Sequence, residues 1–268
     1  MKTILVTGST DGIGLATAKA LLARGHRVLI HGRNQVKVDE VVAELAKLAG
    51  AARVSGHVAD LSDMASIESL ARNLLAEYPR LDVLINNAGV YRVPETVTSQ
   101  GWDMRFAVNT LAPYRLTQLL MPLMTGEGRV INLASAAQAP VDMEALAGET
   151  HLSDDFSAYA QSKLALIMWT RHLARKRDAQ SPLLIAVNPG SLLASKMVKE
   201  GFGVPGKDIN IGADILLRVA LDDEFAKANG EYFDNDSGRF ASPHAHALDD
   251  ERCHEVVAVM ERFPRESA

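Results

Sequence analysis

Cysteine is nearly absent from this chain of 268 residues, in which Cys253 is the single example. One thiol can form neither an intrachain disulfide nor a thiolate metal cluster, and such chains are typical of a reducing compartment. We therefore expect a cytoplasmic location. His244 and His246 form an isolated His-x-His pair without a third ligand at metal-binding spacing, so the sequence predicts no metal site. The other histidines, His31 among them, are expected to be ordinary polar residues.

Long apolar runs are absent as well. The longest stretches are short ones such as residues 165–169, well below the roughly 18 residues that a membrane-spanning helix needs. Only two residues separate Met1 from the first apolar run, which predicts no leader peptide. Basic residues are not in excess, because 28 Lys and Arg stand against 33 Asp and Glu, for a net charge of −5. We expect neither a membrane nor a nucleic acid as a partner.

Apolar residues make up 47% of the chain, enough for one large domain with a deep core. Short apolar runs bounded by Gly, Asn, Asp or Pro alternate with segments of helical periodicity. The runs predict strands at residues 3–6, 27–30, 54–58, 83–85, 129–133, 184–187 and 232–233. The periodic segments predict helices at residues 13–23, 36–48, 66–77, 102–124, 158–176, 213–221 and near 250–263.

The predicted strands are nearly continuous apolar runs, and helices separate them. Such strands are buried on both faces, as in a parallel sheet whose crossover helices cover both sides. The sequence therefore predicts an α/β fold: a single domain over residues 1–268 with a doubly wound, Rossmann-type, seven-stranded parallel sheet flanked by helices. Two further segments are expected to be an insertion at residues 136–157 and a glycine-containing, mobile substrate loop at residues 191–210.

Glycine is concentrated between the first predicted strand and the first helix, where residues 7–14 read Thr-Gly-Ser-Thr-Asp-Gly-Ile-Gly. Glycine allows a tight turn and a close approach of a ligand to the backbone, and a helix N-terminus favours anions. The turn predicts a site for the pyrophosphate of a dinucleotide, with a purely structural turn as the alternative. The residues predicted to bind the cofactor here are Gly8, Ser9, Thr10, Asp11, Gly12, Ile13 and Gly14.

The end of the second strand predicts which nucleotide binds. In doubly wound sheets a carboxylate at this point binds the 2′-hydroxyl of NAD. This chain has Arg33 and Asn34 there instead, and a guanidinium suits the 2′-phosphate of NADP. We expect both residues to bind the cofactor and NADP(H) to be preferred over NAD(H). The alternative is that Arg33 is a solvated surface residue.

Tyr159 and Lys163 lie four residues apart in a predicted helix and therefore share one face. The pair alone is not specific, because a tyrosine and a lysine at this spacing arise often by chance. The chain also contains, in order, the glycine turn, Asn-Asn-Ala-Gly at residues 86–89, Asn109, Ser135 and Asn-Pro-Gly at residues 188–190. With these motifs the chain resembles the short-chain dehydrogenase/reductase family, over residues 3 to about 195.

The resemblance implies an NAD(P)-dependent alcohol dehydrogenase or carbonyl reductase that moves a hydride between nicotinamide C4 and a small-molecule carbonyl or alcohol. Tyr159 would be the general acid or base, Ser135 would bind the substrate oxygen, and Asn109 would hold a water that relays protons to Lys163. A phenol works near neutral pH only if its pKa falls by roughly three units, which Lys163 and the positive nicotinamide would cause. The alternative is a catalytically silent NADP(H)-binding sensor or scaffold.

Further cofactor contacts are implied at the carboxyl ends of the strands. By the same resemblance they are Asp60, Leu61, Asn87, Ala88, Gly89, Tyr159, Lys163, Pro189, Gly190, Leu192 and Ser195. Ser195 stands where the family usually has Thr. Ser135 and Tyr159 are 24 residues apart, a longer gap than in much of the family and similar to that of its retinol-dehydrogenase-like and protochlorophyllide-reductase-like members.

Two predicted helices, at residues 102–124 and 158–176, are apolar around much of their circumference. Apolar helix surface has to be covered by other parts of a protein or by a second copy. We therefore expect a homodimer or homotetramer.

Overall fold

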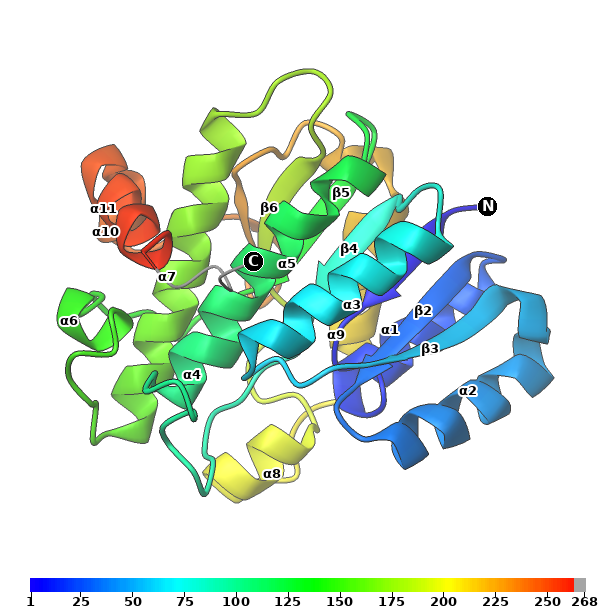
Figure 1. Cartoon of the computed structure of the whole chain (residues 1–268), viewed down its shortest axis with the longest axis horizontal. Helices are drawn as coiled ribbons and strands as arrows, with labels where there is room; N and C mark the ends of the chain where they lie inside the picture. Colours follow the sequence, from blue (N-terminus) through cyan, green and yellow to red (C-terminus); the bar gives the residue numbers. More distant parts are fainter. Residues whose placement is uncertain (263–268) are drawn as a thin grey trace.

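The computed structural model describes residues 1–262, apart from the side chain of Phe202, and its centre is an eight-stranded sheet with helices on both faces (Figure 1). The strands are β1 Thr3–Val6, β2 Arg27–Gly32, β3 Val54–Val58, β4 Val83–Asn86, β5 Arg129–Leu133, β6 Leu183–Asn188, β7 Tyr232–Asp234 and β8 Arg239–Phe240. In space they follow the order β3-β2-β1-β4-β5-β6-β7-β8. The order reverses between β1 and β4, which creates a switch point where ligands bind in doubly wound sheets.

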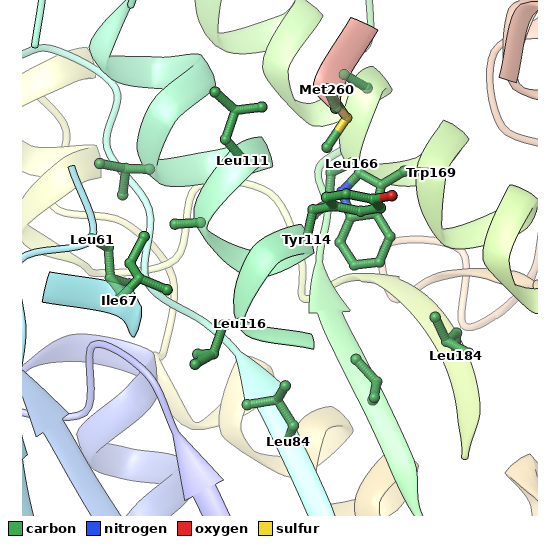
Figure 2. Close-up of a cluster of buried hydrophobic side chains, with 14 of the residues drawn as sticks. Leu61, Ile67, Leu84, Leu111, Tyr114, Leu116, Leu166, Trp169, Leu184 and Met260 are labelled. Atoms are coloured by element: carbon green, nitrogen blue, oxygen red, sulfur yellow. The ribbon is translucent and has the colours of Figure 1, made fainter. Parts of the chain in front are cut away.

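The helices form two layers with a hydrophobic core under each. One core joins the sheet to α1 Gly12–Ala23, α2 Gln35–Ala49 and α9 Asn210–Leu221. The other joins it to α3 Met64–Glu77, α4 Met104–Phe106, α5 Ala112–Leu120, α7 Asp155–Arg175 and α11 Asp250–Met260, and Figure 2 shows part of it. Side chains alternate along a strand, so Ile4 and Val6 of β1 face the first core and Leu5 faces the second.

The sheet confirms the doubly wound α/β class and differs from the prediction at its last strand. The seven predicted strands are all present and parallel, and the structure adds β8 as an eighth strand, antiparallel to β7. Both residues of β8, Arg239 and Phe240, are exposed, so no apolar run marks them in the sequence. The other strands lie within two residues of their predicted bounds, since burial on both faces produces continuous apolar runs.

The helices differ more from the prediction. The helix predicted at residues 102–124 is divided into α4, a π-helical turn at Ala107–Leu111, α5 and a 3₁₀ turn at Met121–Leu123. The predicted insertion contains α6 Met143–Leu146 and the start of α7, and the predicted loop contains α8 Lys196–Phe202. These short helices span too few residues for a periodic pattern. Phe263, the predicted end of the last helix, lies outside the described residues.

The middle of α7 is buried on all sides. Every residue from 160 to 170 is buried, which requires cover on the side facing away from the sheet. Part of that cover comes from α11, whose Val256, Val257 and Met260 belong to the same core as Leu166 and Trp169 (Figure 2). Within residues 1–262, the chain thus buries the middle of α7 by itself, and the expected oligomer stays a prediction. Within residues 1–262, no helix has both the length and the apolar composition to cross a membrane.

Candidate functional site

A cleft of about 360 Å³ opens at the carboxyl edge of the sheet, at the switch point beside β1. It gathers residues from the glycine turn, the ends of β2 to β6 and one face of α7. Of the residues predicted to bind a cofactor, it is lined by Gly8, Thr10, Asp11, Gly12, Ile13, Arg33, Asp60, Leu61, Asn87, Ala88, Gly89, Tyr159, Lys163, Pro189 and Ser195. Segments up to 187 residues apart in sequence, from Gly8 to Ser195, therefore meet at one site.

The glycine turn has the backbone conformation that its glycines allow. Gly8 and Gly12 have φ angles of +63° and +58°, in the left-handed region that other residues avoid. A Cβ atom on Gly14 would lie 2.4 Å from the carbonyl oxygen of Gly8, so this residue is required for close packing of helix and turn. Asp11 caps α1, because its carboxylate accepts a hydrogen bond of 2.7 Å from the Gly12 N–H.

Five residues predicted to bind the cofactor do not line the cleft: Ser9, Gly14, Asn34, Gly190 and Leu192. Ser9 is buried, and its hydroxyl donates to the Val6 carbonyl and accepts from the His31 N–H. Asn34 caps α2 by accepting from the Lys37 N–H. Ser9 and Asn34 thus stabilise the backbone next to the cleft through these hydrogen bonds.

His31 is a residue of the cleft that the sequence analysis missed. Its Nδ1 accepts a hydrogen bond of 3.1 Å from the Gly8 N–H, and the side chain is 2% exposed. Burial lowers the pKa of His31 to about 4, so the ring is neutral near pH 7. The neutral ring joins β2 to the first glycine of the turn. The sequence indicates this role of His31 only by its position, one residue before Gly32 at the end of a strand that leads to the cofactor site.

Arg33 lies at the mouth of the cleft and is exposed. Within residues 1–262 it forms no ion pair, so its guanidinium is available to an anion. The nearest candidate for a ribose-binding carboxylate is Asp60, which accepts hydrogen bonds from the backbone and hydroxyl of Ser62 at 2.9 and 2.7 Å. Both bonds reach Oδ1 of Asp60, whereas the Arg33 guanidinium forms no ion pair within residues 1–262.

Tyr159 and Lys163 lie on consecutive turns of α7 and face the cleft together. The Lys163 Nζ lies 5.7 Å from the centre of the Tyr159 ring and donates a 2.7 Å hydrogen bond to the Leu133 carbonyl at the end of β5. Ser135, two residues beyond Leu133, hydrogen-bonds to the Tyr159 hydroxyl. The structure therefore brings together three of the four predicted catalytic side chains.

Burial shifts the pKa values of both Tyr159 and Lys163 away from their ordinary values. Burial raises the pKa of Tyr159, the Ser135 hydrogen bond lowers it in part, and nearby Tyr91 raises it further. Burial also lowers the pKa of Lys163 to about 8. Both groups are withdrawn from water, which disfavours the charged form of each. The prediction that Lys163 and the positive nicotinamide together lower the pKa of the phenol concerns the cofactor complex and stays a prediction; in the protein alone the Lys163 ammonium donates to the Leu133 carbonyl.

Asn109 lies in the π-helical turn, a feature that occurs often at functional sites. It is 1% exposed, and its carboxamide exchanges hydrogen bonds of 2.8 and 2.9 Å with the backbone of Val90 and donates one of 3.0 Å to the Ser162 hydroxyl. It is next to Lys163, since a Cβ atom on Gly89 would lie 3.3 Å from the Asn109 Oδ1 and 3.5 Å from the Lys163 Nζ. The carboxamide is thus held in place beside Lys163, and its contact with a relay water stays a prediction.

Tyr91 is a second residue that the sequence analysis did not identify individually. Its ring packs edge-on against Tyr159, with the centres 5.3 Å apart. On its other side it contacts α8, because a Cβ atom on Gly201 would lie 2.6 Å from the Tyr91 ring. Tyr91 therefore forms the wall between the candidate catalytic tyrosine and the helix that covers this end of the cleft.

Comparison with known proteins places these residues in a wider context. A family model described as short chain dehydrogenase matches residues 2–202. Retinol dehydrogenase 13 of Homo sapiens is 30% identical over 262 residues, covering 91% of this chain and 79% of that protein. Retinol dehydrogenase 12 of Bos taurus is 34% identical over 257 residues, covering 91% of this chain and 81% of that protein.

Solved structures agree with the fold. An uncharacterised protein from Mycobacterium paratuberculosis superposes with a TM-score of 0.81 at 27% identity, covering 99% of this chain and 96% of that one. RhlG of Pseudomonas aeruginosa, solved as an NADP complex, superposes with a TM-score of 0.70 at 26% identity, covering 87% of this chain and 94% of that one. The similarity therefore extends over most of the chain in both sequence and structure.

Proposed function

This chain belongs to the short-chain dehydrogenase/reductase family, in its retinol-dehydrogenase-like branch, and from this membership we propose that it transfers a hydride between the nicotinamide of NADP(H) and a carbonyl or alcohol, with Tyr159 as general acid or base. The observation that carries the proposal is the placement of Tyr159 and Lys163 in the same cleft as the glycine turn. A silent NADP(H)-binding scaffold would have no use for a buried lysine beside a tyrosine that hydrogen-bonds to a serine.

The bound dinucleotide would supply or accept the hydride, and the residues of this chain would control the oxygen of the substrate. In the direction of reduction, the Tyr159 hydroxyl donates its proton to the carbonyl oxygen as the carbon gains the hydride, so an alcohol and a phenolate result. Ser135 already contacts this hydroxyl and can donate a hydrogen bond to the same oxygen. Lys163 stabilises the phenolate electrostatically and stays in place through its bond to Leu133.

NADP(H) is the cofactor that the cleft fits best. Arg33, which lines the cleft and forms no ion pair within residues 1–262, can form a bidentate contact with a 2′-phosphate. The glycine turn can hold the pyrophosphate at the start of α1. That RhlG is solved with NADP supports this choice.

The test is the substitution Tyr159→Phe, which removes only the hydroxyl oxygen. NADPH oxidation is followed by absorbance over a panel of aldehydes, ketones and quinones, with retinal included because relatives are named retinol dehydrogenases. We expect kcat to fall at least about a hundredfold, as for loss of a general acid, with NADPH affinity unchanged. The proposal is wrong if the variant keeps most of its turnover. Tight NADPH binding by the wild-type protein without oxidation of any substrate would favour the sensor.

A further inference from the structure

The segment between β6 and α9 contains a backbone contact between residues near its beginning and residues near its end. The Lys207 N–H donates to the Leu192 carbonyl at 2.7 Å, and the Ala194 N–H donates to the Lys207 carbonyl at 2.8 Å. A Cβ atom on Gly206 would lie 2.7 Å from the backbone of Ala194. We call this contact between residues 192–194 and 206–207 the neck. Beyond it lies α8, and Ser195, Lys196 and Met197 line the cleft.

The neck contains the only non-glycine residue with a positive φ among residues 1–262. Leu192 has a φ of +57°, and its side chain is 43% exposed. Large side chains avoid this conformation, so it persists only where surrounding contacts hold it. The Leu192 side chain is nearly half exposed, so contacts elsewhere in the segment have to contribute to holding this conformation.

The contacts come from the turn between β7 and β8, about 45 residues further along the chain. The Asp236 carboxylate accepts hydrogen bonds from the Ser191 N–H at 2.9 and 3.1 Å, from the Ser191 hydroxyl, and from the Asn188 amide at 2.9 Å. It also lies 3.9 Å from the Lys207 ammonium, on the other side of the neck. One carboxylate therefore hydrogen-bonds to Ser191, which directly precedes the neck, and lies near Lys207 on the opposite side of it.

Asn235 holds the two ends of the segment in the same way. Its amide donates to the Pro189 carbonyl at 2.9 Å and to the Ile211 carbonyl at 3.4 Å. Pro189 precedes the neck and Ile211 follows it, so this side chain joins the point where the segment leaves β6 to the first turn of α9. The family model matches residues 2–202 and does not reach this turn.

We propose that Asp236 and Asn235 are positioning residues that hold segment 189–211 in the conformation that binds the nicotinamide end of the cofactor. The proposal rests on the proposed function, since the segment matters to the reaction only if the cleft takes NADP(H). Neither residue lines the cleft. Their effect is on the population of the binding conformation, and the apparent Kd rises as that population falls. Once the complex has formed, the reacting groups are unchanged, so kcat should be preserved.

The experiment compares the wild-type protein with Asp236→Ala, Asp236→Asn and Asn235→Ala. Ser237→Ala is the matched control, because the Ser237 hydroxyl lies in the same turn and bonds only to the Asp234 carbonyl. Three quantities are measured: the Kd for NADPH by fluorescence titration, kcat with KM, and the rate of tryptic cleavage after Lys196 and Lys199 in α8. A melting temperature for each variant checks that it is folded.

For Asp236→Ala and Asn235→Ala we expect cleavage in α8 to accelerate and the Kd and KM for NADPH to rise on the order of three- to tenfold, with kcat within about twofold of wild type. Asp236→Asn keeps one acceptor oxygen and should recover part of the affinity, and Ser237→Ala should match wild type. Unchanged cleavage and Kd in both alanine variants would overturn the inference. Failure of the wild-type protein to bind NADPH would instead refute the proposed function, and the cleavage rates would still decide whether the turn holds the segment.

Discussion

Acid should destabilise this protein most clearly through the buried ring of His31, because burial disfavours the protonated form there. In the folded state burial holds the pKa of His31 at about 4, against 6.5 for an exposed histidine. Between these pH values the unfolded chain binds a proton that the folded protein rejects. Stability is therefore complete above about pH 6.5 and falls as the pH drops toward 4.

The size of the effect follows from the two pKa values. A difference of about 2.5 pH units at 1.36 kcal/mol each corresponds to roughly 3.4 kcal/mol, of which roughly 2.5 kcal/mol is lost by about pH 4.5. The proton would occupy Nδ1, which accepts from the Gly8 N–H, so the glycine turn should loosen with it. NADPH affinity should decline over the same pH range.

Urea unfolding of wild type and His31→Gln at about pH 7 and about pH 4.5 provides the assay. The side-chain oxygen of glutamine can accept from Gly8 but does not titrate, so the variant should lose about 2.5 kcal/mol less than wild type between the two pH values. Other histidines that do not interact with His31, such as His172, act alike in both proteins and cancel in the comparison. Parallel losses in the two proteins would refute the reasoning, because the acid sensitivity would then arise elsewhere.

Two further changes test the cofactor site. Arg33→Ala should raise the KM for NADPH about tenfold, which corresponds to the loss of one charge-assisted contact of roughly 1.5 kcal/mol, and should leave the KM for NADH unchanged. Equal effects on the two KM values in steady-state kinetics would show that Arg33 does not bind a 2′-phosphate. Gly14→Ala should lower the free energy of unfolding in urea by about 1–3 kcal/mol and weaken NADPH binding. The new methyl group would lie 2.4 Å from the Gly8 carbonyl oxygen and 2.5 Å from the Asn87 amide. A variant as stable as wild type would show that the turn can move to make room for the methyl group.

Local features of the sequence were sufficient for much of the site. The strands could be predicted because strands buried on both faces are continuous apolar runs, and their ends mark the edge where the cleft lies. Tyr159 and Lys163 could be paired because helical spacing places them on one face. Gly8, Gly12 and Gly14 could be identified because steric limits at a tight turn select glycine within a few residues.

Contacts between distant segments could not be predicted in this way. The bond of His31 to Gly8, the cover of α7 by α11, and the hold of Asp236 on Ser191 join residues that carry no mutual signal in one sequence. The pKa of Tyr159 is a similar case, since its direction depends on how much water the fold excludes.

The sequence by itself therefore determined the strand-helix alternation, the glycine turn and the pairing of Tyr159 with Lys163 on one helix face, because these depend on backbone sterics and periodicity over a few residues. The tertiary structure decided which groups meet, which helix covers which, and how far each charge is withdrawn from water. Those properties depend on packing between segments tens to hundreds of residues apart, where neither spacing nor composition specifies a partner.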